Sequence, residues 1–318
     1  MNISFDGQVV VVTGAAGNLG RAYALEAARR GARVVANDLG ADFSGRGRSG
    51  EAIDRVVDEI RAAGGQAIAS YHSVAEREGG EAIFQTAIDA YGRVDALINN
   101  AGNMRVWDFE DTDRADIESL LSIHVLGAFH VTRPIYSHMK DRGYGRILFT
   151  GSGAMLGNAT QTGYGASKGA IAGLMNALAV EGERYGVLCN AILPAAETRM
   201  ANAMKPENFA DIGARVASFA AELQPENCAA MALYLVSREC RSTHAMYSAV
   251  GNRFARIFIG ANEGWLADRG VVPTVEDIAA HFDAISAERL HAIPSSMSDE
   301  YRIISAQIAH RATLTRGA

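Results

Sequence analysis

The stretch VVTGAAGNLGR, residues 11–21, joins an apolar run to the beginning of a helical pattern through a turn with three glycines. A strand, a glycine-rich turn and a helix suit a pyrophosphate, because glycine lets the backbone approach closely and the helix N-terminus offers unpaired N–H groups. Such a turn is a weak signal alone, but its position in the first strand–helix unit strengthens it. We therefore expect a phosphate to bind at Gly14, Gly17 and Gly20.

Short apolar runs alternate with longer helical patterns along the rest of the chain. Strands that alternate with helices predict an α/β fold, with one doubly wound parallel sheet and helices on both of its faces. Residues 1–260 contain no repeat or low-complexity linker, and we interpret them as one domain. We expect residues 261–318 to form a helical C-terminal extension that packs on the same domain. The runs predict about seven strands, at residues 9–13, 33–38, 67–71, 96–102, 146–152, 187–194 and 256–260.

Charge and composition exclude several classes of protein. The 318 residues carry a formal net charge of -6, which makes a general nucleic-acid surface improbable. No run of 18 apolar residues and no signal-peptide pattern occurs, so we expect no membrane span and a cytoplasmic location. The three cysteines form no CxxC or Cys/His cluster, so no metal site is predicted.

The second predicted strand ends in an acidic residue, Asp38. A carboxylate at that point accepts hydrogen bonds from both ribose hydroxyls of an adenosine and repels a 2′-phosphate. Asp38 therefore predicts NAD rather than NADP as the cofactor, with a simple loop cap as the alternative. Arg46 and Arg48 follow soon afterwards and leave open whether NADP also binds.

Four marks of the chain together resemble the short-chain dehydrogenase/reductase family. They are the turn TGAAGNLG at 13–20, NNAG at 99–102, Ser152, and YGASK at 164–168. The resemblance covers residue 5 to about residue 260 and implies a Rossmann-type fold. Its members interconvert alcohols and ketones by hydride transfer with a nicotinamide cofactor.

Three longer stretches resemble one subgroup of that family more closely. The subgroup comprises the dehydrogenase module of peroxisomal multifunctional enzymes of type 2 and its bacterial stand-alone relatives. It oxidises (3R)-hydroxyacyl-CoA thioesters, and members also act on hydroxysteroids, so the resemblance implies that substrate class. The stretches are DLGADFSGRGRSG (38–50), HMKDRGYGRI (138–147) and PAAETRM (194–200).

Tyr164 and Lys168 lie four positions apart, which places them on one face of a helix. A phenol ordinarily ionises at about pH 10. A nearby ammonium and the positive nicotinamide ring both favour the phenolate. Tyr164 can then take a proton from an alcohol while a hydride leaves for NAD⁺.

The resemblance implies that Ser152 binds the substrate oxygen, but the spacing to Tyr164 departs from the family. The usual serine lies thirteen residues before the tyrosine, and here that position is Gly151. Counted from the end of the preceding strand, Ser152 occupies the expected place. We infer a one-residue deletion in the loop between Ser152 and Tyr164, with a displaced serine and a weakened site as the alternative.

Two further positions depart from the family pattern. Most members have Asn at His124, where it supports a water that relays protons through the lysine, whereas the multifunctional-enzyme subgroup also has His. His124 is therefore either a catalytic residue or a core histidine whose polar atoms are satisfied. Asn18 replaces a glycine of the turn, and its side chain is expected to crowd the pyrophosphate without abolishing binding.

The resemblance implies that NAD contacts come from the ends of several strands. The adenine lies beside the residues after the third strand, and the nicotinamide lies beside the end of the sixth. The implied contacts are Gly14, Gly17, Asn18, Leu19, Gly20, Asp38, Ser73, Val74, Asn100, Gly102, Tyr164, Lys168, Pro194 and Thr198.

Two functions of different classes follow. The leading hypothesis is an NAD-dependent dehydrogenase of a 3-hydroxyacyl-CoA or hydroxysteroid-type alcohol. The alternative is a catalytically silent NAD-binding sensor or subunit, suggested by the departures at Asn18, Gly151 and His124. We expect a homodimer or homotetramer, because the family pairs the helices near 113–140 and 162–185, and the tail after residue 260 either joins an interface or covers a neighbour's site.

Overall fold

The computed structural model describes residues 3–41, 47–196 and 219–314, with side chains described as far as residue 308. The chain divides into two units, Met1–Arg256 and Ile257–Ala318.

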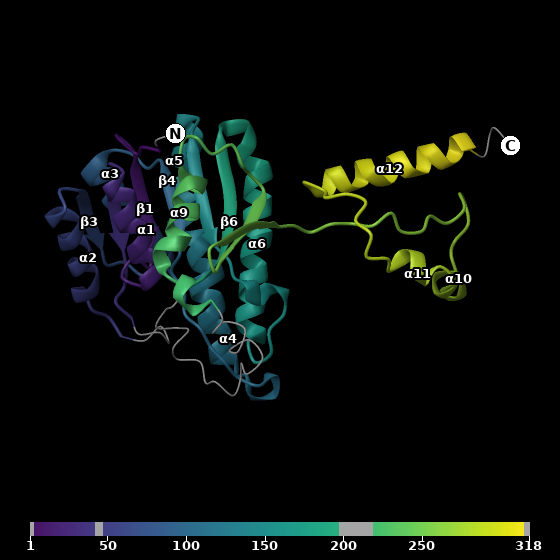
Figure 1. The fold of residues 1–318 in the computed structure, drawn as a ribbon, viewed down its shortest axis with the longest axis horizontal. Coiled ribbons are helices and arrows are strands. Elements are labelled where there is room, and N and C mark those ends of the chain that lie inside the picture. Colours follow the sequence, from purple (N-terminus) through teal and green to yellow (C-terminus); the bar gives the residue numbers. More distant parts are fainter. Residues whose placement is uncertain (1–2, 42–46, 197–218, 315–318) are drawn as a thin grey trace. The chain divides into compact units, whose positions relative to one another are not determined.

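The first unit is built on one sheet with the strand order β3-β2-β1-β4-β5-β6-β7-β8 (Figure 1). The pairs from β3 to β7 are all parallel. The chain winds outward in both directions from β1 and β4, so the predicted doubly wound α/β fold is confirmed. The strands are β1 (Val9–Thr13), β2 (Arg33–Asn37), β3 (Gln66–Ser70), β4 (Ala96–Asn99), β5 (Gly145–Thr150), β6 (Val187–Ala195), β7 (Ala245–Val250) and β8 (Arg253–Ile257).

The last two strands differ from the prediction of about seven strands. The strand predicted at 256–260 lies at 253–257, and β7 was not predicted at all. Only Gly251 and Asn252 separate β7 from β8, with φ angles of 57° and 60°. Two consecutive residues with positive φ make a tight hairpin turn, so β8 runs antiparallel to β7. The Gly-Asn pair between two short apolar runs was the signal for this hairpin.

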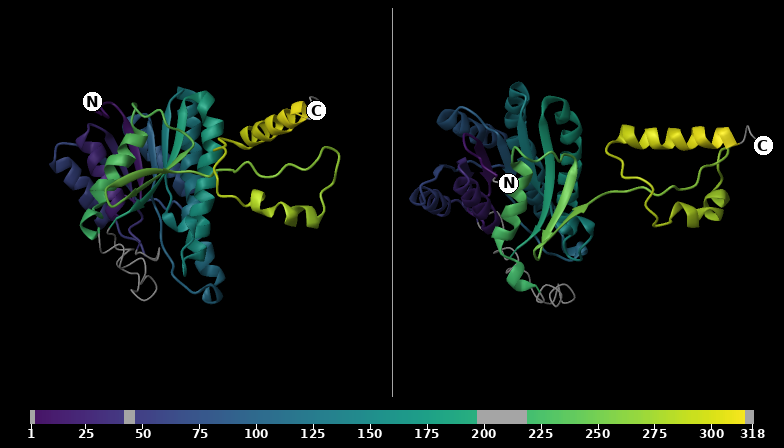
Figure 2. Two further views of the ribbon diagram at one scale, coloured as in Figure 1. Left: turned by 45° about the vertical axis from the view of Figure 1, so that its right-hand side comes forward. Right: turned by 45° about the horizontal axis from the view of Figure 1, so that its top comes forward.

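Helices cover both faces of the sheet (Figures 1 and 2). Helix α1 packs against α2 and α9 on one face, and α3 packs against α5 on the other, where α6 covers β6. A π-helical turn, η2, connects α4 to α5. The helices are α1 (Asn18–Arg29), α2 (Glu51–Ala62), α3 (Arg77–Tyr91), α4 (Arg114–Leu120), η2 (Leu121–Leu126), α5 (Gly127–Arg142), α6 (Thr162–Gly182) and α9 (Pro225–Val236), with short 3₁₀ turns η1 (Phe109–Asp111), η3 (Gly153–Leu156), η4 (Glu183–Tyr185) and η6 (Ala220–Glu222).

The second unit, as far as residue 314, contains the helices α10 (Val275–Ala280), α11 (Phe282–Ile285) and α12 (Met297–Leu314). Thr274 and Asp277 form a reciprocal capping box at the start of α10. The single helix predicted at 273–286 is therefore two, divided at His281. No side chain that the structure describes between residues 257 and 308 is buried. Packing of this extension on the dehydrogenase unit stays a prediction.

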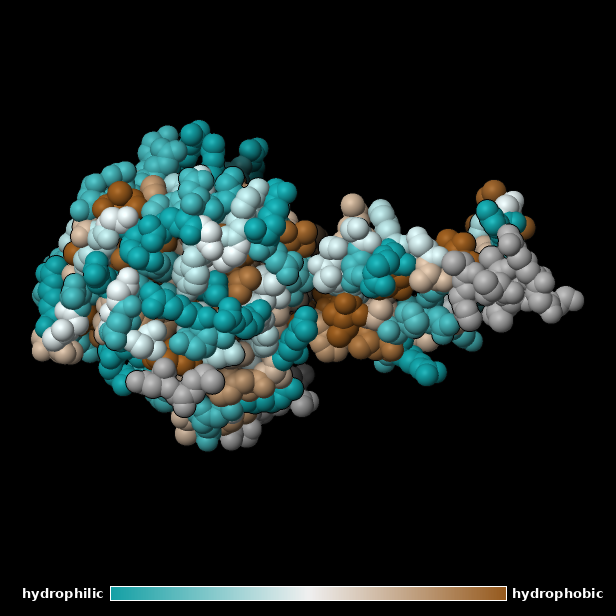
Figure 3. Space-filling model, turned by 90° about the horizontal axis from the view of Figure 1, so that it is seen from above, coloured by the Kyte–Doolittle hydropathy of each residue, from teal (hydrophilic) through white to brown (hydrophobic). Residues whose placement is uncertain are grey.

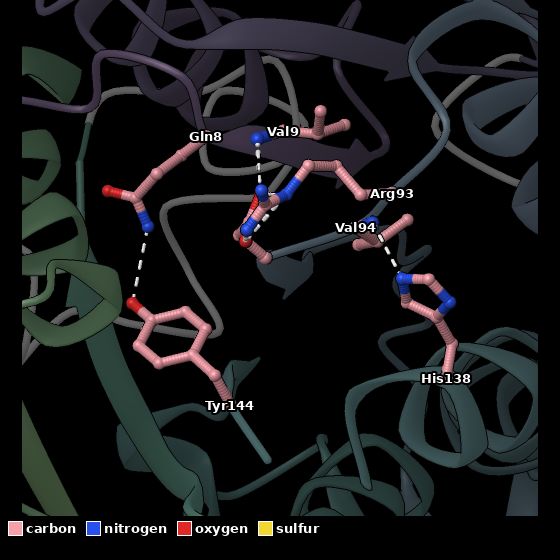
Figure 4. A network of polar contacts seen from close by, with 7 residues as sticks. Gln8, Val9, Arg93, Val94, His138 and Tyr144 are labelled. Atoms are coloured by element: carbon pink, nitrogen blue, oxygen red, sulfur yellow. Dashed lines mark hydrogen bonds and ion pairs between the residues drawn. The ribbon is translucent and has the colours of Figure 1, made fainter. Parts of the chain in front are cut away.

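A polar network ties the amino ends of the central strands together (Figure 4). The Asp95 carboxylate, just before β4, accepts the Val9 N–H of β1 at 2.8 Å and pairs with Arg93. Gln8, just before β1, donates to the Tyr144 hydroxyl before β5 at 3.2 Å. These bonds fix the amino ends of the strands. Ligands of doubly wound sheets bind at the opposite, carboxyl ends of the strands, where a binding site is therefore expected.

Asp95→Ala is expected to destabilise the protein by about 2–4 kcal/mol, because it leaves the Val9 N–H and the Arg93 guanidinium without their acceptor. Asp95→Asn keeps an oxygen for one of them and should cost about half as much. Urea denaturation of both variants measures the difference, with the exposed Asp89→Ala as the matched control. Equal stability of Asp95→Ala and the control would contradict this role.

Candidate active site

The glycine turn is shaped by two contacts that no larger residue permits. Gly14 has a φ of 66°, and a Cβ there would lie 2.8 Å from the Ala101 Cα atom. A Cβ on Gly20 would lie 2.1 Å from the Gly14 carbonyl oxygen. Gly17 differs, because the nearest atom to a Cβ there is 3.5 Å away. Gly17 also caps α1 without a side-chain hydrogen bond, so the helix N-terminus remains open to an anion such as a pyrophosphate.

Asn18 does not need the backbone freedom of glycine. It is the first residue of α1 and is absent from the residues with positive φ. Asn18 is exposed, and Leu19 beside it is half-buried. The conformation of the turn is thus compatible with Asn at this position, whatever its effect on cofactor affinity.

The NNAG stretch holds the glycine turn in place. The Asn100 amide donates to the carbonyl oxygens of Thr13 at 3.1 Å and Gly14 at 3.2 Å. In return, the Thr13 hydroxyl accepts the N–H groups of Asn100 at 3.0 Å and Ala101 at 3.1 Å. Thr13 was not among the predicted site residues, although its place at the strand end was a signal. These bonds lock the ends of β1 and β4 together where the phosphate turn begins.

Asp38 follows β2 and points its carboxylate at the same turn. One oxygen accepts the Ala16 N–H at 2.9 Å, and the other accepts the Gly40 N–H at 2.7 Å. Each carboxylate oxygen keeps acceptor capacity for a ribose hydroxyl. Nearby, the Arg48 guanidinium donates to the Tyr71 carbonyl oxygen at 3.1 Å, whereas Arg46 lies outside the described residues.

The remaining predicted cofactor contacts lie at the ends of neighbouring strands. Ser73 and Val74 follow β3, and the Val74 carbonyl oxygen accepts the Nδ1–H of His130 at 3.1 Å. Pro194 lies near the end of β6 and is half-buried. Gly102 follows β4. Thr198 lies outside the described residues.

Tyr164, Lys168 and Ser152 meet beside these strand ends. A hydrogen bond from Ser152 acts on the Tyr164 hydroxyl, so the shortened loop still brings the serine to the tyrosine. The Lys168 ammonium lies 5.6 Å from the centre of the Tyr164 ring and donates to the Thr150 carbonyl oxygen at 2.8 Å. The chain thus places a phenol, a hydroxyl and an amine around one point.

Burial governs the protonation states of this group in the protein without cofactor. Burial raises the pKa of Tyr164 above its ordinary value, and only the hydrogen bond from Ser152 opposes that rise. Burial also lowers the pKa of Lys168 to about 8. In the protein alone, Tyr164 is therefore a neutral phenol at neutral pH. The expected phenolate needs the charge of a bound cofactor in addition to Lys168.

A small cavity lies behind Lys168 and has space for about one water molecule. The Thr150 hydroxyl lines it and has no hydrogen-bond partner among the described residues. This is the place where the family resemblance implies a proton-relay water. Thr150 was not among the predicted site residues, because only the fold brings the end of β5 against α6. Thr13, Asn99, His124 and Lys168 supply the other polar lining.

His124 lies beside Tyr164 and is 2% exposed. The two rings meet edge to face, with centroids 5.5 Å apart and an interplanar angle of 80°. The fold therefore brings all four predicted catalytic residues, Tyr164, Lys168, Ser152 and His124, to one site.

Among the described residues, no cluster of His, Cys, Asp and Glu has the arrangement of a metal site, and no helix is long and apolar enough to cross a bilayer.

Comparisons with known proteins identify the family of this chain. The family model described as short chain dehydrogenase matches residues 8–208. Peroxisomal multifunctional enzyme type 2 of Mus musculus is 43% identical over 246 residues, covering 77% of this chain and 32% of that enzyme. A short-chain type dehydrogenase/reductase of Mycobacterium tuberculosis is 38% identical over 280 residues, covering 88% of this chain and 94% of the relative. The crystal structure of a short chain dehydrogenase from Mycobacterium avium has a TM-score of 0.74 and 32% identity, covering 91% of this chain and 98% of its own.

This chain therefore belongs to the short-chain dehydrogenase family, with the Rossmann-type fold that the motifs predicted. Its relatives include peroxisomal multifunctional enzymes and stand-alone bacterial dehydrogenases, which confirms the resemblance to that subgroup. The chain spans about a third of the mouse enzyme's length.

The buried Lys168 is expected to make stability depend on pH. Its pKa is about 8 in the folded chain against about 10.5 when unfolded, so the unfolded state binds more protons between these values. The free energy of unfolding therefore rises with pH in that window.

Replacing the amine tests this dependence. Lys168→Met lacks the buried charge, so its stability relative to wild type should fall by about 2 kcal/mol between about pH 7 and about pH 10. Urea denaturation of both proteins at the two pH values measures the change. A difference that stays constant with pH would exclude Lys168 as its source.

Proposed function

We propose that this chain is an NAD-dependent dehydrogenase that interconverts a secondary alcohol and a ketone. The observation that carries the proposal is the meeting of Tyr164, Ser152 and Lys168 beside an open, glycine-shaped helix N-terminus. A phenol held by a hydroxyl group can exchange a proton with a substrate oxygen, and the turn suits the pyrophosphate of a dinucleotide.

The residues divide the chemistry between them. Bound NAD⁺ would supply the acceptor for the hydride of the alcohol carbon, and the balanced reaction converts alcohol and NAD⁺ into ketone, NADH and a proton. The Ser152 hydroxyl orients the alcohol oxygen, and Tyr164 receives its proton through the phenol oxygen. Lys168 has a pKa of about 8 in the protein alone, so a large fraction carries charge at neutral pH and favours the tyrosinate.

Asp38 supports NAD as the cofactor. Its carboxylate is oriented by two backbone N–H groups, from Ala16 and Gly40, and so faces the turn with a fixed geometry. Negative charge there favours a ribose with free hydroxyls over one with a 2′-phosphate. Arg48 is engaged by the Tyr71 carbonyl oxygen, which reduces its ability to offset that charge.

The resemblance to the multifunctional-enzyme subgroup supports a 3-hydroxyacyl-CoA or hydroxysteroid-type alcohol as substrate. Two loops beside the site are joined by the Trp107 N–H, which donates to the Thr160 carbonyl oxygen at 2.9 Å. They expose apolar side chains, Trp107 and Leu156 among them. An acyl chain or a steroid skeleton has the apolar surface that such side chains bind.

We also propose that the protein forms a homodimer or homotetramer. The α4–α5 segment exposes several large apolar side chains, which suits a helix pairing between subunits. The extension exposes more of them, visible as brown areas in Figure 3, and has no buried side chain of its own among those described. It needs a partner surface, on its own dehydrogenase unit as predicted or on a neighbour. The exposed side chains of α4–α5 are Ile117, Leu121, Leu126 and Phe129.

The cytoplasmic location stays a prediction.

Tyr164→Phe removes only the phenol oxygen and should lower kcat by at least about 10³-fold, because proton transfer loses its acceptor. The assay is NADH absorbance with purified protein, NAD⁺ and a panel of 3-hydroxyacyl-CoAs and hydroxysteroids. Calorimetry with NAD⁺ is the control, and the loss of NAD⁺ affinity should be at most a few-fold, because the variant keeps the ring and loses one polar contact. Full activity of Tyr164→Phe would overturn its role. A wild-type protein that binds NAD⁺ but turns over nothing would favour the sensor alternative.

Asp38→Asn should weaken the binding of NAD⁺. It should also lower the ratio of kcat/KM for NAD⁺ to kcat/KM for NADP⁺ by about tenfold, because the charge that repels a 2′-phosphate is lost. Glu51→Gln, an exposed acid at the start of α2, is the matched control and should leave the ratio unchanged. An unchanged ratio in Asp38→Asn would assign the preference to another residue.

A further inference from the structure

His124 is turned into the protein by an irregular helical turn. It lies in η2, the π-helical turn Leu121–Leu126 between α4 and α5. The residues at the two ends of this turn, Leu121 and Leu126, are 38% and 50% exposed, whereas His124 is 2% exposed. Single π turns inside α-helices shift the positions of side chains relative to a regular helix and are frequent at functional sites. The imidazole therefore lies between the segment after β4 and the start of α6.

The hydrogen bonds of His124 assign the position of its proton. The Asn103 N–H, which can only donate, points at Nε2 over 3.1 Å. Nε2 therefore carries a lone pair, and the proton of the neutral ring is on Nδ1. Nδ1–H then donates to the Ser167 hydroxyl at 2.7 Å. Ser167 in turn donates to the Tyr164 carbonyl oxygen at 2.7 Å.

This chain of bonds runs in one direction and uses both ring nitrogens. It begins at the Asn103 backbone, passes through the imidazole and the Ser167 hydroxyl, and ends on the backbone of Tyr164. A proton added at Nε2 would face the Asn103 N–H and break the first bond. The lone pair on Nε2 and the proton on Nδ1 are both engaged in these hydrogen bonds. The imidazole in this arrangement therefore does not relay protons.

The surroundings also fit a neutral ring. Gly102 leaves room for it, since a Cβ there would lie 3.0 Å from Nε2. The ionisable groups that face the ring are Lys168 and Tyr164. Burial and the Lys168 ammonium together hold the pKa of His124 well below its ordinary value.

We propose that His124 is a positioning residue for Tyr164, held as the neutral Nδ1–H tautomer, and that it takes no part in proton transfer. It joins the NNAG segment, which holds the cofactor turn, to the first turn of α6, which carries the phenol. The edge-to-face contact of the two rings adds to this support. The kinetic consequence rests on the proposed dehydrogenase function, whereas the tautomer does not.

The tautomer is tested by ¹⁵N NMR of the ring nitrogens in protein labelled at its 8 histidines. The signal that disappears in His124→Gln identifies His124. We expect it to show a protonated Nδ1 and a bare Nε2 from about pH 5.5 to about pH 8.5, a range in which an exposed histidine titrates. A protonated Nε2, or titration within that range, would overturn the proposal, and neither outcome depends on enzyme activity.

The kinetic test uses three substitutions that separate the two bonds. His124→Asn places an amide donor near the position of Nδ1 and keeps the bond to Ser167, and His124→Gln places an acceptor near Nε2 and keeps the bond from Asn103. His124→Ala loses both. We expect kcat to fall about 10²-fold in His124→Ala and about tenfold in the two amides, with the midpoint of the kcat–pH profile unchanged in all three.

Ser167→Ala is the matched variant, because it breaks the same bond as His124→Gln and leaves the imidazole in place. The two should lose similar activity. Amide variants that fold normally but are as inactive as His124→Ala, or a shifted pH profile, would show instead that His124 transfers protons. If the wild type turns over no alcohol, the proposed function fails, and the NMR result alone decides the role of His124.

Discussion

The close approach of Gly20 to the Gly14 carbonyl oxygen is the contact on which the site depends. A Cβ on Gly20 would lie only 2.1 Å from that oxygen. Because glycine has no Cβ, the start of α1 can lie directly against the end of β1. Asn100 then closes the turn from β4, through its bonds to the carbonyl oxygens of Thr13 and Gly14. The open helix N-terminus, the carboxylate of Asp38 and the NNAG segment take their relative positions from this junction.

Burial controls the chemistry of the side chains that gather there. It raises the pKa of Tyr164, lowers that of Lys168 to about 8 and lowers that of His124. Each shift has the same cause, because the charged form of each group loses its hydration. In the protein alone Tyr164 and His124 are therefore neutral at neutral pH, whereas Lys168 is still largely protonated. Charge on a bound cofactor has a large effect in such buried surroundings.

The amino ends of the strands contribute to stability, and the carboxyl ends carry the candidate active site. At the amino ends, Asp95 and the residues bonded to it join β1 to β4, and most of these polar groups are satisfied by one another. At the carboxyl ends, polar groups remain available, among them the Thr150 hydroxyl and the carboxylate of Asp38. A sheet that is tied at one edge keeps the other edge in a constant geometry for a ligand.

Much of this protein follows from its sequence by local rules. Short apolar runs that alternate with longer helical patterns predicted β1 to β6 and the main helices, because backbone geometry and burial act over a few residues. The Gly14–Gly20 turn, Asp38 and the YGASK stretch predicted the site, because chemistry restricts the residue types that can serve there.

Other features were decided only by tertiary structure. The place of Ser152 beside Tyr164 depends on how the shortened loop closes, and the roles of Thr150, Asn103 and Ser167 depend on which elements meet around the site. The sequence left His124 open between catalyst and core residue. The position of its proton depends on a donor 21 residues away and an acceptor 43 residues away along the chain. Hydrogen-bond direction and desolvation are properties of neighbours in space, and the fold alone determines which residues those are.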